Sequence, residues 1–144
     1  MAVELQDLGL AVKRLQHRHH RTLDTKLNQI GATIAQWDAL RAIGRYPDSS
    51  SHRLAQVTFQ TDQSFGTLAN RMVVRGLIER VPGPGRAVRH RLTSEGEEML
   101  KKGLAVADEV LAQSFAPLDS AERDTLHELL TRLNEAEAQS DVAE

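Results

Sequence analysis

The sequence predicts a mainly α-helical protein with one small β-hairpin near its middle. Two observations carry this prediction. Apolar residues recur at spacings of three and four along most of the 144-residue chain. The stretch from Leu77 to Thr93, LIERVPGPGRAVRHRLT, instead alternates apolar and polar residues beside a Pro-Gly-Pro-Gly tip. With 40% hydrophobic residues, the chain has enough apolar surface to build a core around these elements.

The first predicted helix occupies about residues 1–30. Its apolar residues fall on one face, and Gly31 ends the pattern. The next helix begins after Thr33, because Thr33 and Gln36 form a capping-box pattern. Its core-facing residues then follow at helical spacing, as Trp37, Leu40 and Ile43.

Two short helices follow in tandem after a loop at Pro47. The first contains the residues HRLAQVT, and the second begins at Thr61, a good N-cap, and stops at Gly76. The apolar face of the second helix is formed by Phe65, Leu68 and Met72. A short helix, a brief turn and a helix with a polar first turn are typical of a helix-turn-helix.

The hairpin is the most basic part of the chain. Leu77 starts its first strand, and on the return strand Arg89 and Arg91 alternate with apolar neighbours. Pro82 to Gly85 cannot continue a ladder, so we expect them to form the tip. From residue 71 to residue 91 there are six arginines and one acid, although the whole chain has a net charge of -2. This segregation favours a polyanion as the partner of the segment.

Two further helices complete the predicted fold. Thr93 or Ser94 caps the first, Pro117 ends it, and Asp119 with Glu122 caps the last. The last helix carries a leucine stripe at Leu126, Leu129, Leu130 and Leu133. The apolar stripes of the outer helices exceed what one small lobe needs, which predicts a homodimer.

The order of elements is that of a winged helix-turn-helix lobe with N- and C-terminal dimerisation helices. On the residues NRMVVRGLIER and RAVRHRLTSEG, the chain resembles the MarR family of bacterial transcriptional regulators. The resemblance implies one domain over 1–144, with a DNA-binding lobe at about 33–96 and dimerisation helices at about 1–30 and 97–138. One departure is the wing tip: the family's wings carry Asp-Arg-Arg, of which PGPGRAV keeps only Arg86. A shorter wing is therefore expected.

The second helix of the tandem is expected to enter the major groove of double-stranded DNA. Gln63 can pair with adenine, short hydroxyl side chains can meet base edges, and Asp62 either accepts from cytosine or only complements the helix dipole. Gly66 suits either a close approach to DNA or tight packing. Arginines further along and on the wing suit phosphates, and Arg86 suits a narrow minor groove. The residues expected to contact DNA are Thr61, Asp62, Gln63, Ser64, Thr67, Asn70, Arg71, Arg75, Arg86, Arg89 and Arg91. A surface ion pair is the alternative for each arginine, but a single acid within the segment offers six arginines too few partners.

A small aromatic or phenolic effector is implied by the family resemblance, with His19, Trp37 and Arg41 lining its pocket. The alternative for Trp37 is a place in the core. Within the run His17 to His20, His17 and His20 at i and i+3 could share a metal, but a solvated or phosphate-facing basic helix end is the preferred interpretation, so no metal and no cofactor are expected.

Other functions have weaker support in the sequence. There is no P-loop, nucleotide fingerprint or nucleophile elbow, so an enzyme would have to be a metal-dependent one built on the histidines. A winged helix used for protein contacts alone is the remaining alternative. No apolar run approaches 18 residues and no signal-peptide pattern opens the chain, so we expect a cytoplasmic protein without a membrane partner.

Overall fold

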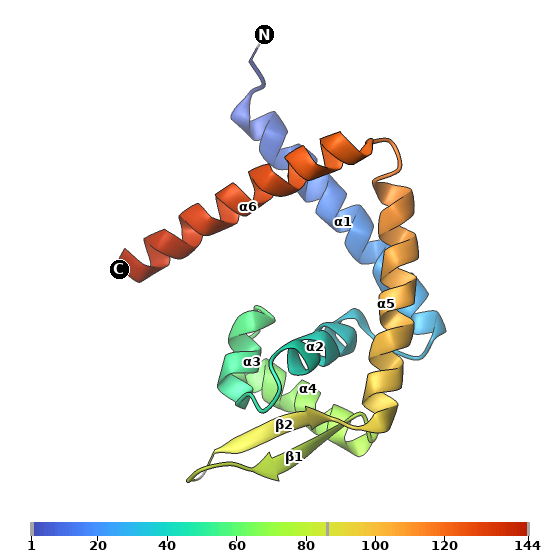
Figure 1. The fold of residues 1–144 in the computed structure, drawn as a ribbon, viewed down its shortest axis with the longest axis vertical. Helices are drawn as coiled ribbons and strands as arrows, with labels where there is room; N and C mark the ends of the chain where they lie inside the picture. Colours follow the sequence, from blue (N-terminus) through green and yellow to red (C-terminus); the bar gives the residue numbers. More distant parts are fainter. Residues whose placement is uncertain (1, 86, 144) are drawn as a thin grey trace. The chain divides into compact units, whose positions relative to one another are not determined.

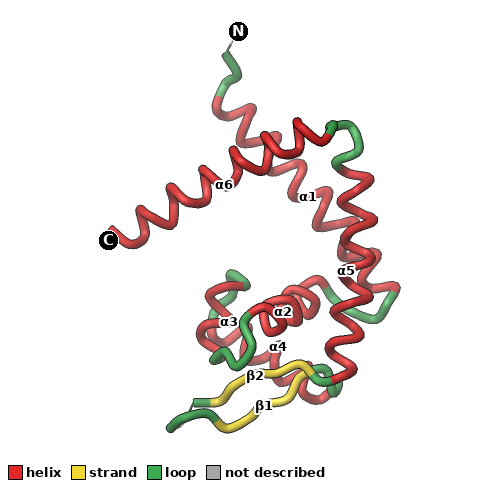
Figure 2. The backbone as a smooth tube through the Cα atoms, in the orientation of Figure 1, coloured by secondary structure: helices red, strands yellow, loops and turns green. Residues whose placement is uncertain are grey.

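The computed structural model describes residues 2–85 and 87–143, and for residues 137–143 it describes the backbone alone. The chain divides into two compact units, Met1–Val110 and Leu111–Glu144. The elements, in chain order, are α1 (Leu5–Gln29), α2 (Ile34–Arg45), α3 (Ser51–Val57), α4 (Asp62–Val74), β1 (Ile78–Pro82), β2 (Val88–Leu92), α5 (Ser94–Ser114) and α6 (Ser120–Ala143). Figure 2 shows the hairpin as the two yellow segments among red helices. The predicted fold class, mainly α with one hairpin, is confirmed.

Helix starts follow the local chemistry of their capping residues. The Thr33 hydroxyl accepts from the Gln36 N–H at 3.1 Å, and the Gln36 carboxamide oxygen accepts from the Thr33 N–H at 3.1 Å. Ser50 and Thr61 cap α3 and α4 in the same way, each by accepting a backbone N–H three residues ahead. These bonds satisfy donors that the first helical turn leaves unpaired. The predicted N-caps of α2 and α4 are therefore confirmed.

The larger core lies where α2, α3, α4 and the hairpin come together (Figure 1). Its buried side chains include Leu40, Ile43, Leu54, Phe65, Met72 and Ile78. A second cluster joins α1, α2 and α5 through Leu27, Trp37 and Ala107. Trp37 is only 3% exposed, and Gly103 of α5 lies against its indole so closely that any Cβ there would overlap the ring.

The wing is a two-stranded antiparallel hairpin with Arg80 opposite His90 and Pro82 opposite Val88. The expectation that Pro82 belongs to the tip is wrong by one residue. Proline needs no ladder N–H at the last position of a strand, and the Gly83 N–H closes the turn by donating to the Ala87 carbonyl at 2.8 Å. Arg86 lies outside the described residues.

The last helix forms a unit with the end of α5. The predicted capping box is present, because the Asp119 N–H donates to Glu122 and the Glu122 N–H donates to Asp119. The helical backbone continues to Ala143, five residues beyond the expected end at about 138. Across the described part of the chain, no helix is both long enough and apolar enough to cross a bilayer.

Candidate nucleic-acid interface

Helix α4 presents a polar face to solvent because its apolar face is fixed in the core. Phe65 and Met72 are fully buried, whereas Gln63, Thr67 and Asn70 are exposed. The exposed positions follow the spacing i, i+4 and i+7, so they form one stripe along the helix. Helix α4 thus has the amphipathic form that a groove-reading helix requires, with its base-reading candidates together on the outer side.

The first turn of α4 is anchored to α3 as well as capped. Thr61 is the N-cap, and the carboxylate of Asp62 lies 2.9 Å and 3.1 Å from Nδ1 of His52. Ser64 is exposed in this turn, beside Gln63. A Cβ built on Gly66 would meet no atom of the described residues within 4 Å. Tight packing therefore does not explain this glycine, whereas close approach of a ligand backbone would.

The middle of α4 is bonded to the wing. Nη2 of Arg80, on β1, donates to Oδ1 of Asn70 at 2.7 Å. Arg71, the next residue along the helix, is exposed. The guanidinium group of Arg80 therefore holds the amide of Asn70, one of the residues expected from the sequence to contact DNA.

The end of α4 is bonded to the turn between α1 and α2. Arg75 donates through Nη1 to Oε1 of Gln36 at 2.9 Å and through Nη2 to the Gly31 carbonyl at 2.8 Å. Arg75 was expected at a phosphate, and the structure directs two of its donors into the protein instead. Its placement favours a role in positioning the recognition helix.

The arginines of β2 differ in their surroundings. Nε of Arg91 donates to the Asp48 carboxylate at 2.6 Å, which ties the wing to the loop before α3. This hydrogen bond lowers the pKa of Asp48 and raises the pKa of Arg91. Arg89 is half-buried, with its side chain beside Gly83 at the tip.

A buried histidine joins the wing to the loop before α3. The Nδ1–H of His90 donates to the Ser49 carbonyl at 3.1 Å, and its ring meets Phe65 edge-on. Among the residues that the structure describes, Nε2 of His90 has no hydrogen-bond partner. Loss of water on burial lowers the pKa of His90, with a further lowering by Arg80, while the Ser49 bond opposes both. His90 therefore favours the neutral form in the folded protein.

Sequence reasoning missed the partners that hold this surface together. From the sequence, no site role was predicted for His52, Asp48 or Arg80. Each of them nevertheless bonds a residue that was expected to contact DNA. Each partner lies at least ten positions away in the chain, beyond the reach of helical or strand spacing rules. The only available signal was charge: Arg80 belongs to the basic segment, and Asp48 is an acid just outside it.

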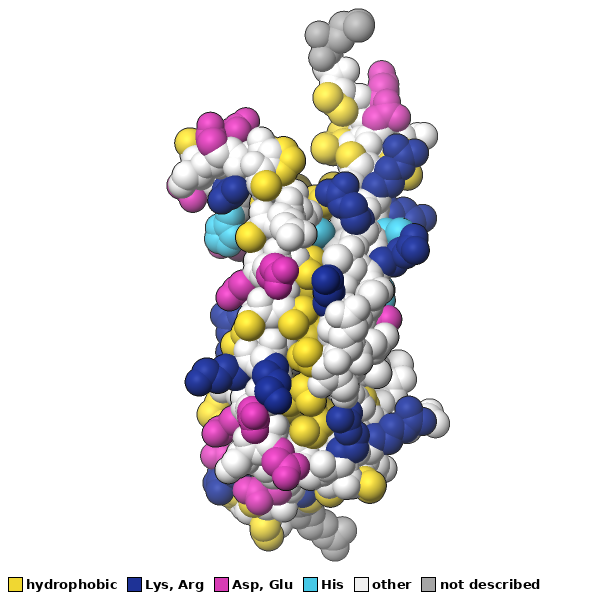
Figure 3. All heavy atoms as spheres, turned by 90° about the vertical axis from the view of Figure 1, so that its right-hand side faces the viewer, with side chains coloured by type: hydrophobic (Ala, Val, Ile, Leu, Met, Phe, Trp, Pro, Cys, Tyr) yellow, Lys and Arg dark blue, Asp and Glu magenta, His cyan; other side chains and the backbone are white. Residues whose placement is uncertain are grey.

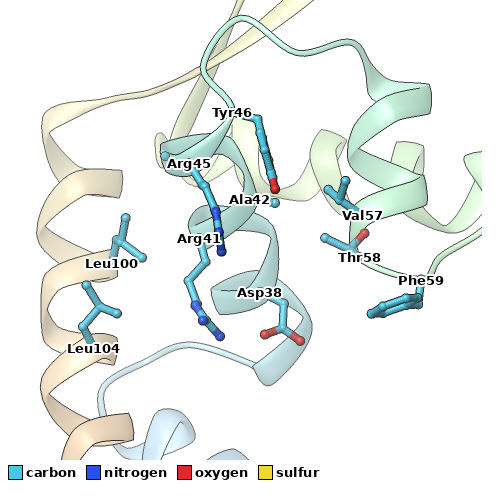
Figure 4. Close-up of a pocket in the computed structure, with 11 residues that line it drawn as sticks. Asp38, Arg41, Ala42, Arg45, Tyr46, Val57, Thr58, Phe59, Leu100 and Leu104 are labelled. Atoms are coloured by element: carbon cyan, nitrogen blue, oxygen red, sulfur yellow. The ribbon is translucent and has the colours of Figure 1, made fainter. Parts of the chain in front are cut away.

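A pocket of 490 Å³ lies beside the helix-turn-helix (Figure 4). Helix α2 lines it with Asp38, Arg41 and Arg45, the turn before α4 lines it with Thr58 and Phe59, and α5 lines it with Leu100 and Leu104. Of the residues predicted for an effector pocket, Arg41 lines it, and the guanidinium carbon of Arg41 lies 4.6 Å from the centre of the Trp37 ring. His19 is half-buried on α1 and is not among the lining residues.

The pocket combines charge with apolar walls. Asp38 is exposed as a residue, but its carboxyl group faces the pocket, where partial loss of water raises its pKa against the opposing effects of Arg41 and His20. Phe59 has φ of 58° and is 97% exposed. Two arginines, one carboxyl group and several apolar side chains suit a small amphipathic anion.

The surroundings of His17 on α1 are basic. No group of three or more His, Asp or Glu side chains suited to a metal ion occurs among the residues that the structure describes. His17 instead lines a shallow hollow on α1 with basic neighbours, namely Arg18, Arg21 and Lys26.

Comparisons with known proteins agree with this geometry. A model of the MarR family matches residues 30–87. A probable transcriptional regulator from Pseudomonas aeruginosa is 31% identical, with a TM-score of 0.76, and the alignment covers 90% of this chain and 99% of that one. A mutant of E. coli MarR in complex with operator DNA is 22% identical, with a TM-score of 0.80 and coverage of 88% and 93%. A MarR family protein of Mycobacterium tuberculosis in complex with salicylic acid is 24% identical, with a TM-score of 0.73 and coverage of 88% and 95%.

The comparison with curated proteins found no match. The family match begins just after α1 and ends before β2, and the matched segment holds the exposed stripe of α4. The similarity to the Pseudomonas aeruginosa regulator extends over nearly the whole of both chains. The chain has a winged helix-turn-helix, matches the family model over this lobe and resembles the Pseudomonas aeruginosa regulator along nearly its whole length. It therefore belongs to the MarR family.

Proposed function

We propose that the protein is a transcriptional regulator that binds a pseudo-palindromic DNA operator as a homodimer and is released by a small aromatic acid. The observation that carries the proposal is the polar stripe of α4, held on a rigid core next to a basic wing. Gln63, Ser64 and Thr67 read base edges in the major groove. The proposed role is regulation rather than catalysis. Because the proposed partner is chromosomal DNA, the proposed location is the cytoplasm.

Phosphate contacts supply most of the affinity in this proposal. Arg71 on α4 and Arg89 on the wing flank the base-reading stripe, and Arg86 is assigned to the minor groove. Asp62 is already paired with His52, which favours a role in holding the helix over acceptance from cytosine. Arg75 and Arg91 hold the same surface in place through their bonds to Gln36 and Asp48.

A second copy of the chain is the proposed partner of the outer helices. Leu5, Leu8 and Val12 of α1 are exposed, as are Leu129 and Leu130 of α6. Hydrophobic side chains also form a surface strip with Lys and Arg on either side in the view of Figure 3. Apolar faces of this extent suit association with a second copy.

Leu126→Glu with Leu130→Glu should give monomers in sedimentation and weaken operator binding, whereas a monomeric wild type at micromolar concentration would refute the dimer.

The effector is assigned to the pocket beside the helix-turn-helix. Arg41 and Arg45 suit a carboxylate, and Leu100, Leu104 and Phe59 suit an aromatic ring. The pocket wall includes Thr58 and Phe59, which precede the N-cap of α4 by three and two residues. A ligand held there therefore meets the turn that sets the start of the recognition helix. The relative bound to salicylic acid supports the chemical class.

The proposal is tested by footprinting the DNA upstream of the protein's own coding region, followed by binding titrations on the protected duplex. Gln63→Ala should lose discrimination at particular base pairs, by about 1–3 kcal/mol each. Arg71→Ala should weaken all duplexes alike and reduce the slope of log affinity against log salt by about one. Binding to a scrambled duplex with the same affinity as the operator would contradict sequence-specific regulation. A complete absence of salt-dependent duplex binding would favour a winged helix that contacts proteins alone.

A further inference from the structure

We infer that Arg80 is a positioning residue that makes Asn70 a hydrogen-bond donor toward DNA. The inference rests on the proposed DNA-binding function and names a residue that acts on specificity without touching the duplex. The central observation is the 2.7 Å hydrogen bond from Nη2 of Arg80 to Oδ1 of Asn70.

The register of the wing explains why Arg80 reaches the recognition helix. Arg80 lies directly opposite His90, and residues that face each other across antiparallel strands share one side of the sheet. His90 is buried, with its ring against Phe65 of α4. Arg80 therefore lies on the side of the wing that is turned toward α4, and its long side chain extends to Asn70 at the helix surface.

The chemistry of the two groups fixes the orientation of the Asn70 amide. A guanidinium group offers only donors, whereas an asparagine amide has one acceptor oxygen and one NH₂ group. The oxygen of Asn70 must therefore face Arg80, which directs the NH₂ group away from the wing. Gln63, Thr67 and Asn70 form the exposed stripe, so this NH₂ group is presented on the surface assigned to the major groove.

A fixed orientation restricts what Asn70 can recognise. An NH₂ group can donate to phosphate oxygens, to purine N7, to guanine O6 or to thymine O4. It cannot accept from adenine N6 or cytosine N4, which a freely rotating amide could do with its oxygen. Arg80 thus turns an ambivalent side chain into a selective one, and its removal should broaden the choice of base at the position that Asn70 meets.

The competing role for Arg80 is a direct phosphate contact, and the two roles differ in salt dependence. Each phosphate neutralised by an arginine contributes about 0.9 to the slope of log affinity against log salt. An arginine that acts only through Asn70 contributes nothing to that slope. The two roles also differ in additivity, because a residue that acts through Asn70 has no effect once the Asn70 side chain is removed.

The test is a double-mutant cycle of wild type, Arg80→Ala, Asn70→Ala and the double variant, measured by fluorescence anisotropy on the footprinted duplex at several salt concentrations. Arg80→Ala and Asn70→Ala should each reduce affinity roughly 3- to 10-fold, the value of one hydrogen bond. The double variant should be no weaker than Asn70→Ala, and Arg80→Ala should keep the wild-type salt slope. Arg71→Ala is the matched control, with a slope reduced by about one.

Single base-pair substitutions in the duplex complete the experiment. Arg80→Ala should tolerate substitutions at one base pair that the wild type rejects, and thermal unfolding should show that the variant is folded. Additive losses with a reduced salt slope, or an Arg80→Ala protein that binds as tightly and as selectively as wild type, would overturn this inference alone. A wild type that binds no duplex would overturn the proposed function together with it.

Discussion

Phe59 occupies a backbone conformation that should make glycine the more stable residue at its position. Its φ of 58° lies in the left-handed region, which costs a residue with a Cβ about 1–2 kcal/mol. The side chain is 97% exposed, so contacts of the ring within the protein do not offset this strain. Glycine removes the strain but gives the unfolded chain more freedom, at a cost of about 0.4–1 kcal/mol. Phe59→Gly should therefore stabilise the fold by roughly 0.5–1 kcal/mol.

Thermal and urea unfolding measure this effect. A gain of this size should raise Tm by about 1–4 °C for a chain of this length. Phe59→Ala is the control, because it removes the ring but keeps the Cβ and the strain, and it should leave stability nearly unchanged. If Phe59→Gly were no more stable than Phe59→Ala, the strain argument would be wrong. If Phe59→Ala lost 2 kcal/mol or more, the ring would have to pack in solution.

The same variants connect the strain to function. Strained residues persist where they serve a site, and Phe59 lines the proposed effector pocket. On the proposed function, with salicylate as the probe for a small aromatic acid, Phe59→Gly should bind salicylate more weakly than wild type while its DNA affinity without ligand stays the same. Trp37 is the single tryptophan of the chain and lies against Arg41 of the pocket, so its fluorescence can report the titration. Equal salicylate affinity in both proteins would exclude Phe59 from the site.

Three further predictions concern contacts that hold the elements of the fold together. Burial is the main cause that lowers the pKa of His90. The contribution of His90 to stability is therefore complete above the ordinary histidine pKa of about 6.5, and it is lost as the pH falls below that value. Urea unfolding of His90→Gln should accordingly show a smaller loss of stability than wild type between about pH 7.5 and pH 5.5, and an equal loss would contradict this role. Gly103→Ala should destabilise the protein by about 1–3 kcal/mol, because the added methyl overlaps Trp37, and calorimetry showing an unchanged Tm would refute that packing. Arg75→Ala should weaken duplex binding without changing the slope of log affinity against log salt. A slope reduced by about one would instead indicate that Arg75 contacts a phosphate directly.

Much of the fold could be predicted because its determinants are local. Thr33 with Gln36, Thr61, and Asp119 with Glu122 start helices through bonds that span three residues, and capping patterns in the sequence reveal such bonds. The amphipathic spacing of α4 separated its buried side from its exposed side. The proposed base-reading residues follow from that separation, and whether they contact DNA stays a prediction.

The partners of the arginines could not be predicted, because they are distant or uncharged. The basic segment holds one acid for six arginines, which suggested that most of the arginines bind a polyanion. Arg75 and Arg80 instead bond neutral oxygens of Gln36, Gly31 and Asn70, which a count of acids ignores. Arg91 bonds an aspartate 43 positions earlier. Only the folded chain brings these acceptors within reach.

The carboxamide oxygen of Gln36 accepts two hydrogen bonds from different parts of the fold. One comes from the Thr33 N–H at the start of α2, and the other comes from Arg75 at the end of α4. A carbonyl oxygen has two lone pairs, so this atom is saturated, and a flip of the amide would break both bonds together. The first turn of α2 and the last turn of α4 should consequently open as one cooperative unit in native-state hydrogen exchange, with matched protection that Gln36→Ala lowers at both ends.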